Sequence, residues 1–390
     1  MTLSEYSCIK CFVSCPPTHY KVISNMSLYL CVDCGGSKTS AVVCSASGEV
    51  LGRALSGPSN FAYMGNQRFA QSVREAVSGA LKACFSPTEP IVLPPKTSLF
   101  ASAWFGISGV DSPNAADAAA TILSELLNLP KGPSLVVAND THLLAAPLRL
   151  HPDVNHAVVV IAGTGSICVS FTQTAQGTLE ELGRVGGWGW ILGDEGGGFH
   201  VGREAIRQLL IDTDKVSLGG PPPPHSVLKQ RILDRFGVST PLDLLTIVHL
   251  PDPAPYTVHP PDVPGHLRVV REGRLSQLSP LVFNAAFGDG DPFALNILQT
   301  SAQALASHIR VLLRSPNAAS EHAPKAVLAS ESIICFGGSL VGIEKYREMI
   351  LDVLKDEQMG GHVFKYVEYV DDAAKIGAEG LAAACAGAEK

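Results

Sequence analysis

Charged residues are sparse in this chain of 390 residues, and the positive ones are outnumbered. It holds 29 Lys and Arg against 36 Asp and Glu, a formal net charge of -7, and only 17% of its residues are charged. A nucleic-acid-binding protein needs a wide basic face, which so thin a spread of Lys and Arg does not supply. Apolar runs such as Ala157 to Ala162 are far shorter than the roughly 20 residues that cross a bilayer. We therefore expect a soluble protein with neither a nucleic-acid nor a membrane partner.

Signs of secretion are also lacking. Most of the ten cysteines lie inside apolar runs, as Cys31 does, where a reduced thiol behaves as a small hydrophobe. Residues 1–26 show neither the apolar stretch nor the cleavage site of a signal peptide. Three closely spaced cysteines there, Cys8, Cys11 and Cys15, could hold a metal, but we expect a weakly ordered extension. A reducing, cytoplasmic compartment fits this pattern best.

The length exceeds what one hydrophobic core usually organises, so we expect two domains with a ligand cleft between them. Strands alternate with helical patterns, which predicts mixed sheets covered by helices. Prolines gather between about Gly219 and Arg271, where we expect surface loops flanking a helical insert.

One device occurs twice along the chain. The segments Leu28 to Val43 and His156 to Phe171 each read as a strand, a glycine-containing turn and a second strand. The first turn, Asp33-Cys-Gly-Gly-Ser-Lys-Thr39, offers backbone amides, hydroxyls and the Lys38 ammonium to an anion. The second, Gly163-Thr-Gly-Ser166, offers amides and hydroxyls without charge. Each alone could be an ordinary turn, but together they could grip one nucleotide from opposite domains. Neither has the spacing of a P-loop, and a strand, not a helix, follows the first.

Two aspartates end apolar strands near these turns. Asp140 could simply cap the helix that follows it. Alternatively, it accepts the proton of a substrate hydroxyl that attacks the terminal phosphorus of ATP. Asp33 is suited to Mg²⁺, which needs only a carboxylate besides phosphate oxygens and water.

Glycine is most concentrated between Gly186 and Gly198, with seven glycines around two tryptophans and an acidic pair. Ordering so many glycines costs more backbone entropy than ordering other residues, which suggests that a ligand approaches the backbone closely here. Asp194 or Glu195 could accept hydrogen bonds from sugar hydroxyls, and Trp188 could face a pyranose ring or an acetyl methyl group. The alternative is that the tryptophans belong to the core and the carboxylates cap a helix.

Two shorter motifs complete the set. Asn60 follows a Gly-Pro-Ser turn and could both donate to and accept from a sugar. Gly337-Gly-Ser339 follows an apolar strand, where backbone without side chains would let a nucleoside lie flat. Each of the two reads as a plain turn when taken alone.

In this order, the motifs resemble those of the N-acetylglucosamine kinase family, which is grouped with the BadF/BadG-type ATPases in the sugar kinase, Hsp70 and actin superfamily. The resemblance covers most of Leu28 to Ala386, and Gly-Trp-Gly with Gly-Asp-Glu-Gly is its most specific part. It implies an α/β fold of the two-domain actin-like ATPase (ribonuclease H-like) type, with an interdomain cleft. The expected domains are 27–150, joined by a C-terminal helix 372–390, and 151–371, with the insert at about 212–285.

The resemblance also implies roles for single residues. Asp140 would be the base toward the 6-hydroxyl of the sugar and Asp33 the Mg²⁺ ligand. The nucleotide would contact Gly35, Gly36, Ser37, Lys38, Thr39, Gly163, Thr164, Gly165, Ser166, Gly337, Gly338 and Ser339. The sugar would contact Asn60, Asn139, Gly187, Trp188 and Asp194. The family tip often reads Asp or Glu, Gly, Gly, Gly, Thr, whereas this chain has Cys34 and Ser37-Lys38-Thr39, so Lys38 could alter the phosphate contacts.

These implications predict ATP-dependent phosphorylation of N-acetyl-D-glucosamine at its 6-hydroxyl, for amino-sugar catabolism or salvage. Three alternatives stay open: a kinase for another hexose or amino sugar such as glucosamine, a BadF-type activator ATPase with an iron–sulfur cluster, and a catalytically silent sugar-binding relative. Family members often pair, so a homodimer is an option.

Overall fold

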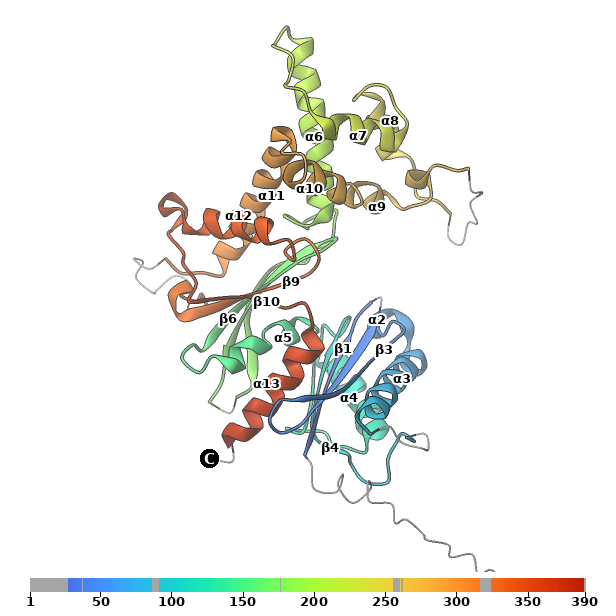
Figure 1. Cartoon of the computed structure of the whole chain (residues 1–390), viewed down its shortest axis with the longest axis vertical. Coiled ribbons are helices and arrows are strands. Elements are labelled where there is room, and N and C mark those ends of the chain that lie inside the picture. Colours follow the sequence, from blue (N-terminus) through green and yellow to red (C-terminus); the bar gives the residue numbers. More distant parts are fainter. Residues whose placement is uncertain are drawn as a thin grey trace, which may run out of the picture.

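The computed structural model describes residues 27–36, 38–85, 91–175, 177–254, 260, 262–315 and 324–388. The predicted extension 1–26 and the predicted phosphate contact Ser37 lie outside the described residues. Figure 1 shows two lobes, each built on one sheet, with a helical projection on the second.

The N-terminal lobe carries a five-stranded mixed sheet of order β3-β2-β1-β4-β5. The first three strands are antiparallel and the last two parallel to β1. Its strands are β1 (Leu28–Cys34), β2 (Thr39–Cys44), β3 (Val50–Ser56), β4 (Phe100–Ile107) and β5 (Leu135–Ala138).

Alternation along β1 builds a core on each face of this sheet, because successive side chains of a strand point to opposite faces. Leu30 and Val32 pack with α3 (Asn66–Phe85) and α4 (Pro113–Leu127), whereas Tyr29 and Cys31 pack with α13 (Ala373–Ala388). The helix at the C-terminus thus covers the sheet at the start of the chain, as Figure 1 shows.

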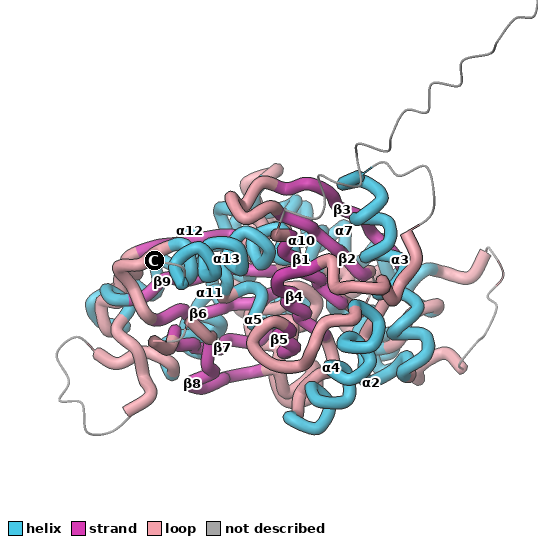
Figure 2. The backbone as a smooth tube through the Cα atoms, turned by 90° about the horizontal axis from the view of Figure 1, so that it is seen from below, coloured by secondary structure: helices cyan, strands magenta, loops and turns pink. Residues whose placement is uncertain are grey.

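The C-terminal lobe carries a second five-stranded mixed sheet, of order β10-β9-β6-β7-β8. Its strands are β6 (His156–Ala162), β7 (Ser166–Gln173), β8 (Leu179–Gly186), β9 (Ser332–Gly337) and β10 (Tyr366–Tyr369). One face packs on α6 (Gly198–Ser217), α11 (Pro292–Val311) and α12 (Glu344–Lys355). The other packs on α5 (Thr141–Leu144) and η1 (Ala146–Leu150). Viewed from below, α5 and α13 lie between the two sheets (Figure 2).

Short helices make up the projection in the predicted insert. They are α7 (Val227–Phe236), α8 (Asp243–His249), η2 (Gly265–Leu267), α9 (Arg271–Ser276) and α10 (Ser279–Phe287). Elsewhere lie α2 (Phe61–Met64), η3 (Ala329–Glu331) and η4 (Glu357–Met359). Within the described ranges, no helix has the length and apolar character needed to traverse a bilayer.

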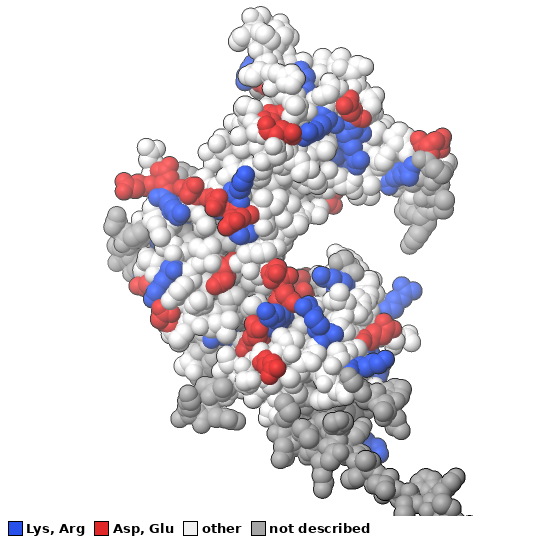
Figure 3. Space-filling view, viewed as in Figure 1, with Lys and Arg blue, Asp and Glu red and all other residues white. Residues whose placement is uncertain are grey.

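The surface is hollowed between the lobes, on the side where the projection overhangs α2 (Figures 1 and 3). The strands of the first sheet all fall within the predicted range 27–150 and those of the second within 151–371. The domain bounds themselves stay a prediction.

Candidate active site

The turn between β1 and β2 is tied to the segment that follows β3. The Gly35 amide donates to the Lys38 carbonyl (3.0 Å), and the Ser59 amide donates to the Gly35 carbonyl (3.0 Å). The Thr39 hydroxyl, fully buried, donates to the Gly57 carbonyl (2.7 Å). The Thr39 hydroxyl, predicted to contact nucleotide, thus has an internal partner, whereas Gly36 and Lys38 are exposed.

Two carboxylates lie close together beneath this turn. Burial and the neighbouring charge of Asp140 raise the pKa of Asp33 to about 6, against the opposing effect of the Lys38 ammonium. Burial also raises the pKa of Asp140, with a further contribution from Asp111. Two desolvated carboxylates facing one ammonium leave an excess of negative charge, which favours a cation between them.

Asp140 does not cap the helix that it precedes. Its carboxylate makes no capping hydrogen bond to α5; the Asn139 side-chain oxygen accepts from the Thr141 amide instead (3.0 Å). The Thr141 amide and the Ser108 hydroxyl lie near enough to oppose the rise in the Asp140 pKa. The carboxylate is thus positioned by these neighbours, is half-buried, and does not cap the helix.

Ser108 joins these groups, and sequence reasoning missed it. Its amide donates to the Cys34 carbonyl (2.9 Å), its carbonyl accepts from the Phe61 amide (2.9 Å), and its hydroxyl accepts from Asn60 Nδ2 (3.0 Å). The only signal in the sequence is a serine between two glycines at the end of an apolar strand, Gly106-Ile-Ser-Gly109.

Those two glycines permit close packing around Ser108. A Cβ at Gly106 would lie 3.2 Å from Asp140 Cα, and one at Gly109, where φ is +84°, would lie 2.8 Å from Asn60 Oδ1. A side chain at either position would therefore push the aspartate or the asparagine away.

Asn60 and Asn139, both predicted to hold sugar, already have protein partners. Asn60 Oδ1 accepts from the Ala62 amide (3.0 Å) and caps α2, which leaves one N–H of its amide for a ligand. Asn139 Nδ2 donates to Asp111 Oδ1 (2.9 Å).

Asn139 and Asp111 line a cavity of about 400 Å³ between the lobes. Ile167 and Arg184 of the C-terminal lobe form the facing wall. His142 also lines it, and burial lowers the pKa of this histidine to about 4, so the ring is neutral near pH 7. The predicted cleft thus contains a cavity to which both lobes contribute.

The second tip, Gly163 to Ser166, is held from below by the glycine-rich segment and α6. Its carbonyls accept from α6: Gly163 from the Gly198 amide (2.8 Å) and Thr164 from the Phe199 amide (3.0 Å). The amides of Thr164 and Gly165 donate to no group in the part of the chain that the structure describes. They are therefore free to meet an anion.

Asp194 lies inside this tip rather than at its surface. It is 6% exposed, has a left-handed backbone (φ +65°), and accepts from the Ser166 amide through Oδ1 (3.0 Å). A Cβ at Gly165 would lie 2.5 Å from that oxygen. Asp194, predicted to hold a sugar hydroxyl, is thus buried here and supports the tip, and a side chain at position 165 would collide with its carboxylate.

Glu195 is held beside Asp194 by two basic side chains. His200 Nε2 lies 2.7 Å and Arg203 Nη2 3.0 Å from Glu195 Oε2, and Glu195 is 27% exposed. Burial lowers the pKa of His200, against the effect of the Glu195 carboxylate.

Trp188 and Trp190 differ in surroundings. Trp188 is 56% exposed and its ring lies 5.6 Å from His308, whereas Trp190 packs against Phe199. Gly187 donates to the Ser166 carbonyl (3.0 Å), so Trp188 starts directly beside the tip. The interpretation of both tryptophans as core residues is therefore wrong for Trp188.

The end of β9 meets the same tip, because β9 runs parallel to β6. A Cβ at Gly338, where φ is +101°, would lie 2.6 Å from the Ala162 carbonyl oxygen and 3.2 Å from the Gly163 nitrogen. Gly337, Gly338 and Ser339 thus lie beside Gly163, where one nucleotide could contact both segments.

Asp33 fits the predicted magnesium site chemically. The described residues contain no group of three His, Cys, Asp or Glu side chains placed to hold a metal. Mg²⁺ does not require one, since it is usually bound by one or two carboxylates with phosphate and water oxygens. Asp33, desolvated beside Asp140, supplies such a carboxylate.

Comparison with known proteins agrees with the resemblance to the N-acetylglucosamine kinase family. N-acetyl-D-glucosamine kinase of Dictyostelium discoideum is 26% identical over 288 residues, covering 74% of this chain and 79% of that protein. N-acetylmuramic acid/N-acetylglucosamine kinase of Clostridium acetobutylicum is 24% identical over 289 residues, covering 74% and 80%.

A solved structure described as a putative N-acetylglucosamine kinase from Chromobacterium violaceum superposes with a TM-score of 0.56 at 19% identity, covering 91% of this chain and 99% of that one. This likeness concerns the fold, and it agrees with the predicted α/β architecture of two helix-flanked mixed sheets. A family model matches residues 30–382, and the chain belongs to the BadF/BadG/BcrA/BcrD ATPase family.

Proposed function

We propose that the protein is an ATP-dependent sugar kinase and that it transfers phosphate to the 6-hydroxyl of N-acetyl-D-glucosamine. One observation carries the proposal: Asp140 presents an uncapped, desolvated carboxylate beside Asp33, beneath the turn that follows β1. The names of the two relatives supply the substrate class.

In this mechanism the triphosphate of ATP would lie between the two tips. The free amides of Thr164 and Gly165, with exposed Gly36 and Lys38 opposite, would hold its oxygens. The nucleoside would lie along Gly337 to Ser339. Mg²⁺ held by Asp33 would offset phosphate charge.

Asp140 would accept the proton of the 6-hydroxyl as its oxygen attacks the terminal phosphorus. Its raised pKa makes the carboxylate a stronger base than one in water. Ser108 would orient that carboxylate, and Asn60 in turn orients Ser108 through their 3.0 Å hydrogen bond. The remaining N–H of Asn60 would donate to the sugar.

Product analysis tests the proposal directly. The purified chain with Mg-ATP should convert N-acetylglucosamine to its 6-phosphate, and a panel with glucosamine, N-acetylmuramic acid, N-acetylmannosamine and glucose should rank below it. A preference for another member would correct the sugar, and phosphorylation of none would overturn kinase activity.

An activator ATPase with an iron–sulfur cluster is the second candidate. Such a cluster requires accessible cysteines, but the cysteines among the described residues are buried or half-buried. A visible-range absorption band in the purified full-length protein would favour this candidate. The homodimer and the cytoplasmic location stay predictions.

A further inference from the structure

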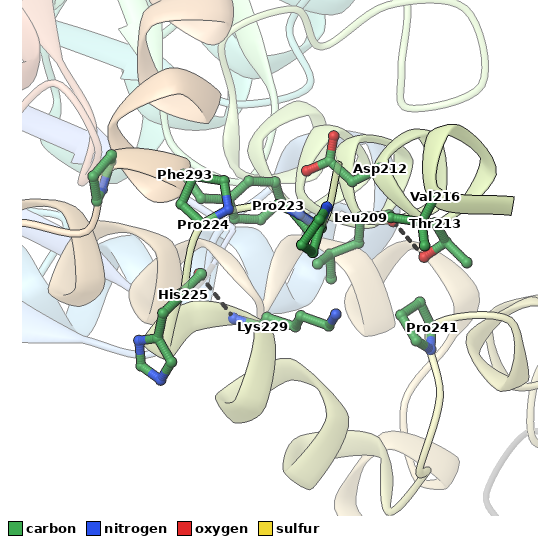
Figure 4. Close-up of a pocket in the computed structure, with 13 residues that line it drawn as sticks. Leu209, Asp212, Thr213, Val216, Pro223, Pro224, His225, Lys229, Pro241 and Phe293 are labelled. Atoms are coloured by element: carbon green, nitrogen blue, oxygen red, sulfur yellow. Dashed lines mark hydrogen bonds between the residues drawn. The ribbon is translucent and has the colours of Figure 1, made fainter. Parts of the chain in front are cut away.

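An apolar cavity lies in the projection, away from the cleft. It measures about 490 Å³ and opens between the second half of α6, the start of α7 and the start of α11 (Figure 4). Small-molecule sites typically measure about 300 to 1,000 Å³ and are mostly apolar with a few polar groups. This cavity has the size of a ligand site.

Its wall is apolar and stiff. Leu209 and Val216 of α6 and Phe293 of α11 supply aliphatic and aromatic surface, and Pro222 to Pro224 with Pro241 close the cavity from the sides. Proline has a fixed φ, so this wall loses little conformational entropy when a ligand arrives. The proline run predicted as a plain surface loop therefore shapes a preformed cavity.

A single ammonium group is available inside it. Figure 4 shows the Lys229 side chain extending along the cavity toward Thr213 and Pro241, while the His225 ring turns away. Across the described ranges, Lys229 has no carboxylate within ion-pair distance. Asp212 also lines the cavity, and its carboxylate is paired with the exposed Lys215 (3.4 Å). The lining is thus mostly apolar, and its ammonium group has no ion-pair partner.

We propose that this cavity binds a small monocarboxylate with an apolar tail, its carboxylate on Lys229 and its tail against Leu209, Val216 and Phe293. The apolar wall contributes the hydrophobic part of the affinity, and the ammonium selects an anion over a neutral or cationic molecule of equal size. The site is separate from the kinase cleft, and the proposal does not depend on the sugar.

Calorimetric titration with octanoate, octanol and octylamine tests it, since the three share one tail and differ in charge. Octanoate should bind at one site per chain and at least about tenfold more tightly than octylamine. Lys229→Glu should reverse that order. Equal affinity for the three probes, or binding of none, would overturn the proposal.

Two variants separate this cavity from other apolar surface. Lys82→Glu makes the same charge change on an exposed side chain of α3, in the other lobe and outside the lining, and should leave octanoate affinity unchanged. Thr213→Trp, on the cavity wall, should abolish binding of octanoate while melting near the wild-type temperature. Asp140→Asn should bind octanoate as wild type does, and weakened binding there would move the site to the cleft.

Discussion

The two glycine-containing tips have the same strand–turn–strand plan but are stabilised differently. The N-terminal tip is exposed and charged: Lys38 lies at its surface, and the carboxylates of Asp33 and Asp140 lie beneath it. The C-terminal tip has no charged residue of its own, and a buried aspartate, Asp194, holds it from below.

This difference suggests that the two tips have different roles, although both have the strand–turn–strand plan. Under the proposed function, the charged tip would handle a proton and a metal, and the backbone amides of the other tip would hold phosphate oxygens. Variants of the carboxylates beneath the N-terminal tip should therefore change catalysis most, while those of the C-terminal tip should change stability and nucleotide affinity.

Asp140→Asn should have the largest effect. The amide keeps the shape but cannot accept the proton, so turnover should fall about 10²- to 10⁴-fold while the KM for sugar stays close to wild type. Steady-state kinetics with Mg-ATP and N-acetylglucosamine measure both. Near-normal turnover would show that the base lies elsewhere.

Asp194→Ala should be the most destabilising change at the C-terminal tip. It removes the acceptor of the buried Ser166 amide and places alanine at a positive φ, at a cost of about 2 to 3 kcal/mol in the free energy of unfolding. Asp194→Asn keeps an acceptor and tolerates this backbone, so it should cost less than about 1 kcal/mol. Urea unfolding compares them. A large rise in the KM for sugar with Asp194→Asn, without loss of stability, would instead restore Asp194 as a sugar ligand.

Asp33→Asn should stabilise the free protein while lowering turnover. The pKa of Asp33 is about 6 in the folded protein against an ordinary value of 3.8, so the folded state binds more protons than the unfolded state between these pH values. The stability that Asp33 contributes is therefore present at low pH and is lost as pH rises through about 6. At pH 7 the variant should gain about 1 to 3 kcal/mol over wild type, and at pH 4 much less. An equal difference at both pH values would contradict this account.

Lys38→Ala should have the smallest effect. An exposed ammonium at the N-terminal tip is worth about 1 kcal/mol to a bound phosphate, so the KM for ATP should rise about three- to tenfold. The difference should shrink with added salt, because screening weakens exposed charges. A KM unchanged at low ionic strength would remove Lys38 from the phosphate site.

The sequence indicated features that depend on local backbone. Both glycine turns and the strand before Asp140 follow from residue order alone. The fold class and family were predictable too, because the motifs recur in a fixed order.

Features that depend on tertiary packing were not predictable. Ser108 reaches Asn60 only because β4 pairs with β1 in a register that brings Ser108 to Cys34. The hydrogen bond from the Ser166 amide to Asp194 was not predicted either, since nothing in the neighbours of Asp194 along the chain indicates that Ser166 lies beside it. The cavity beside the proline run forms only where α6, α7 and α11 pack together, and no local sequence pattern predicts that packing.

Helix α6 gives the molecule a mechanical connection. The helix has 20 residues. Backbone amides of its first turn donate to the carbonyls of Gly163 and Thr164, and its second half lines the cavity in the projection. At 1.5 Å per residue this is a rod of about 30 Å. A ligand in the cavity that tilts one end of α6 would shift the carbonyls of Gly163 and Thr164 at the other end. Any resulting change in the affinity for nucleotide would be matched by an equal change in the affinity for the cavity ligand.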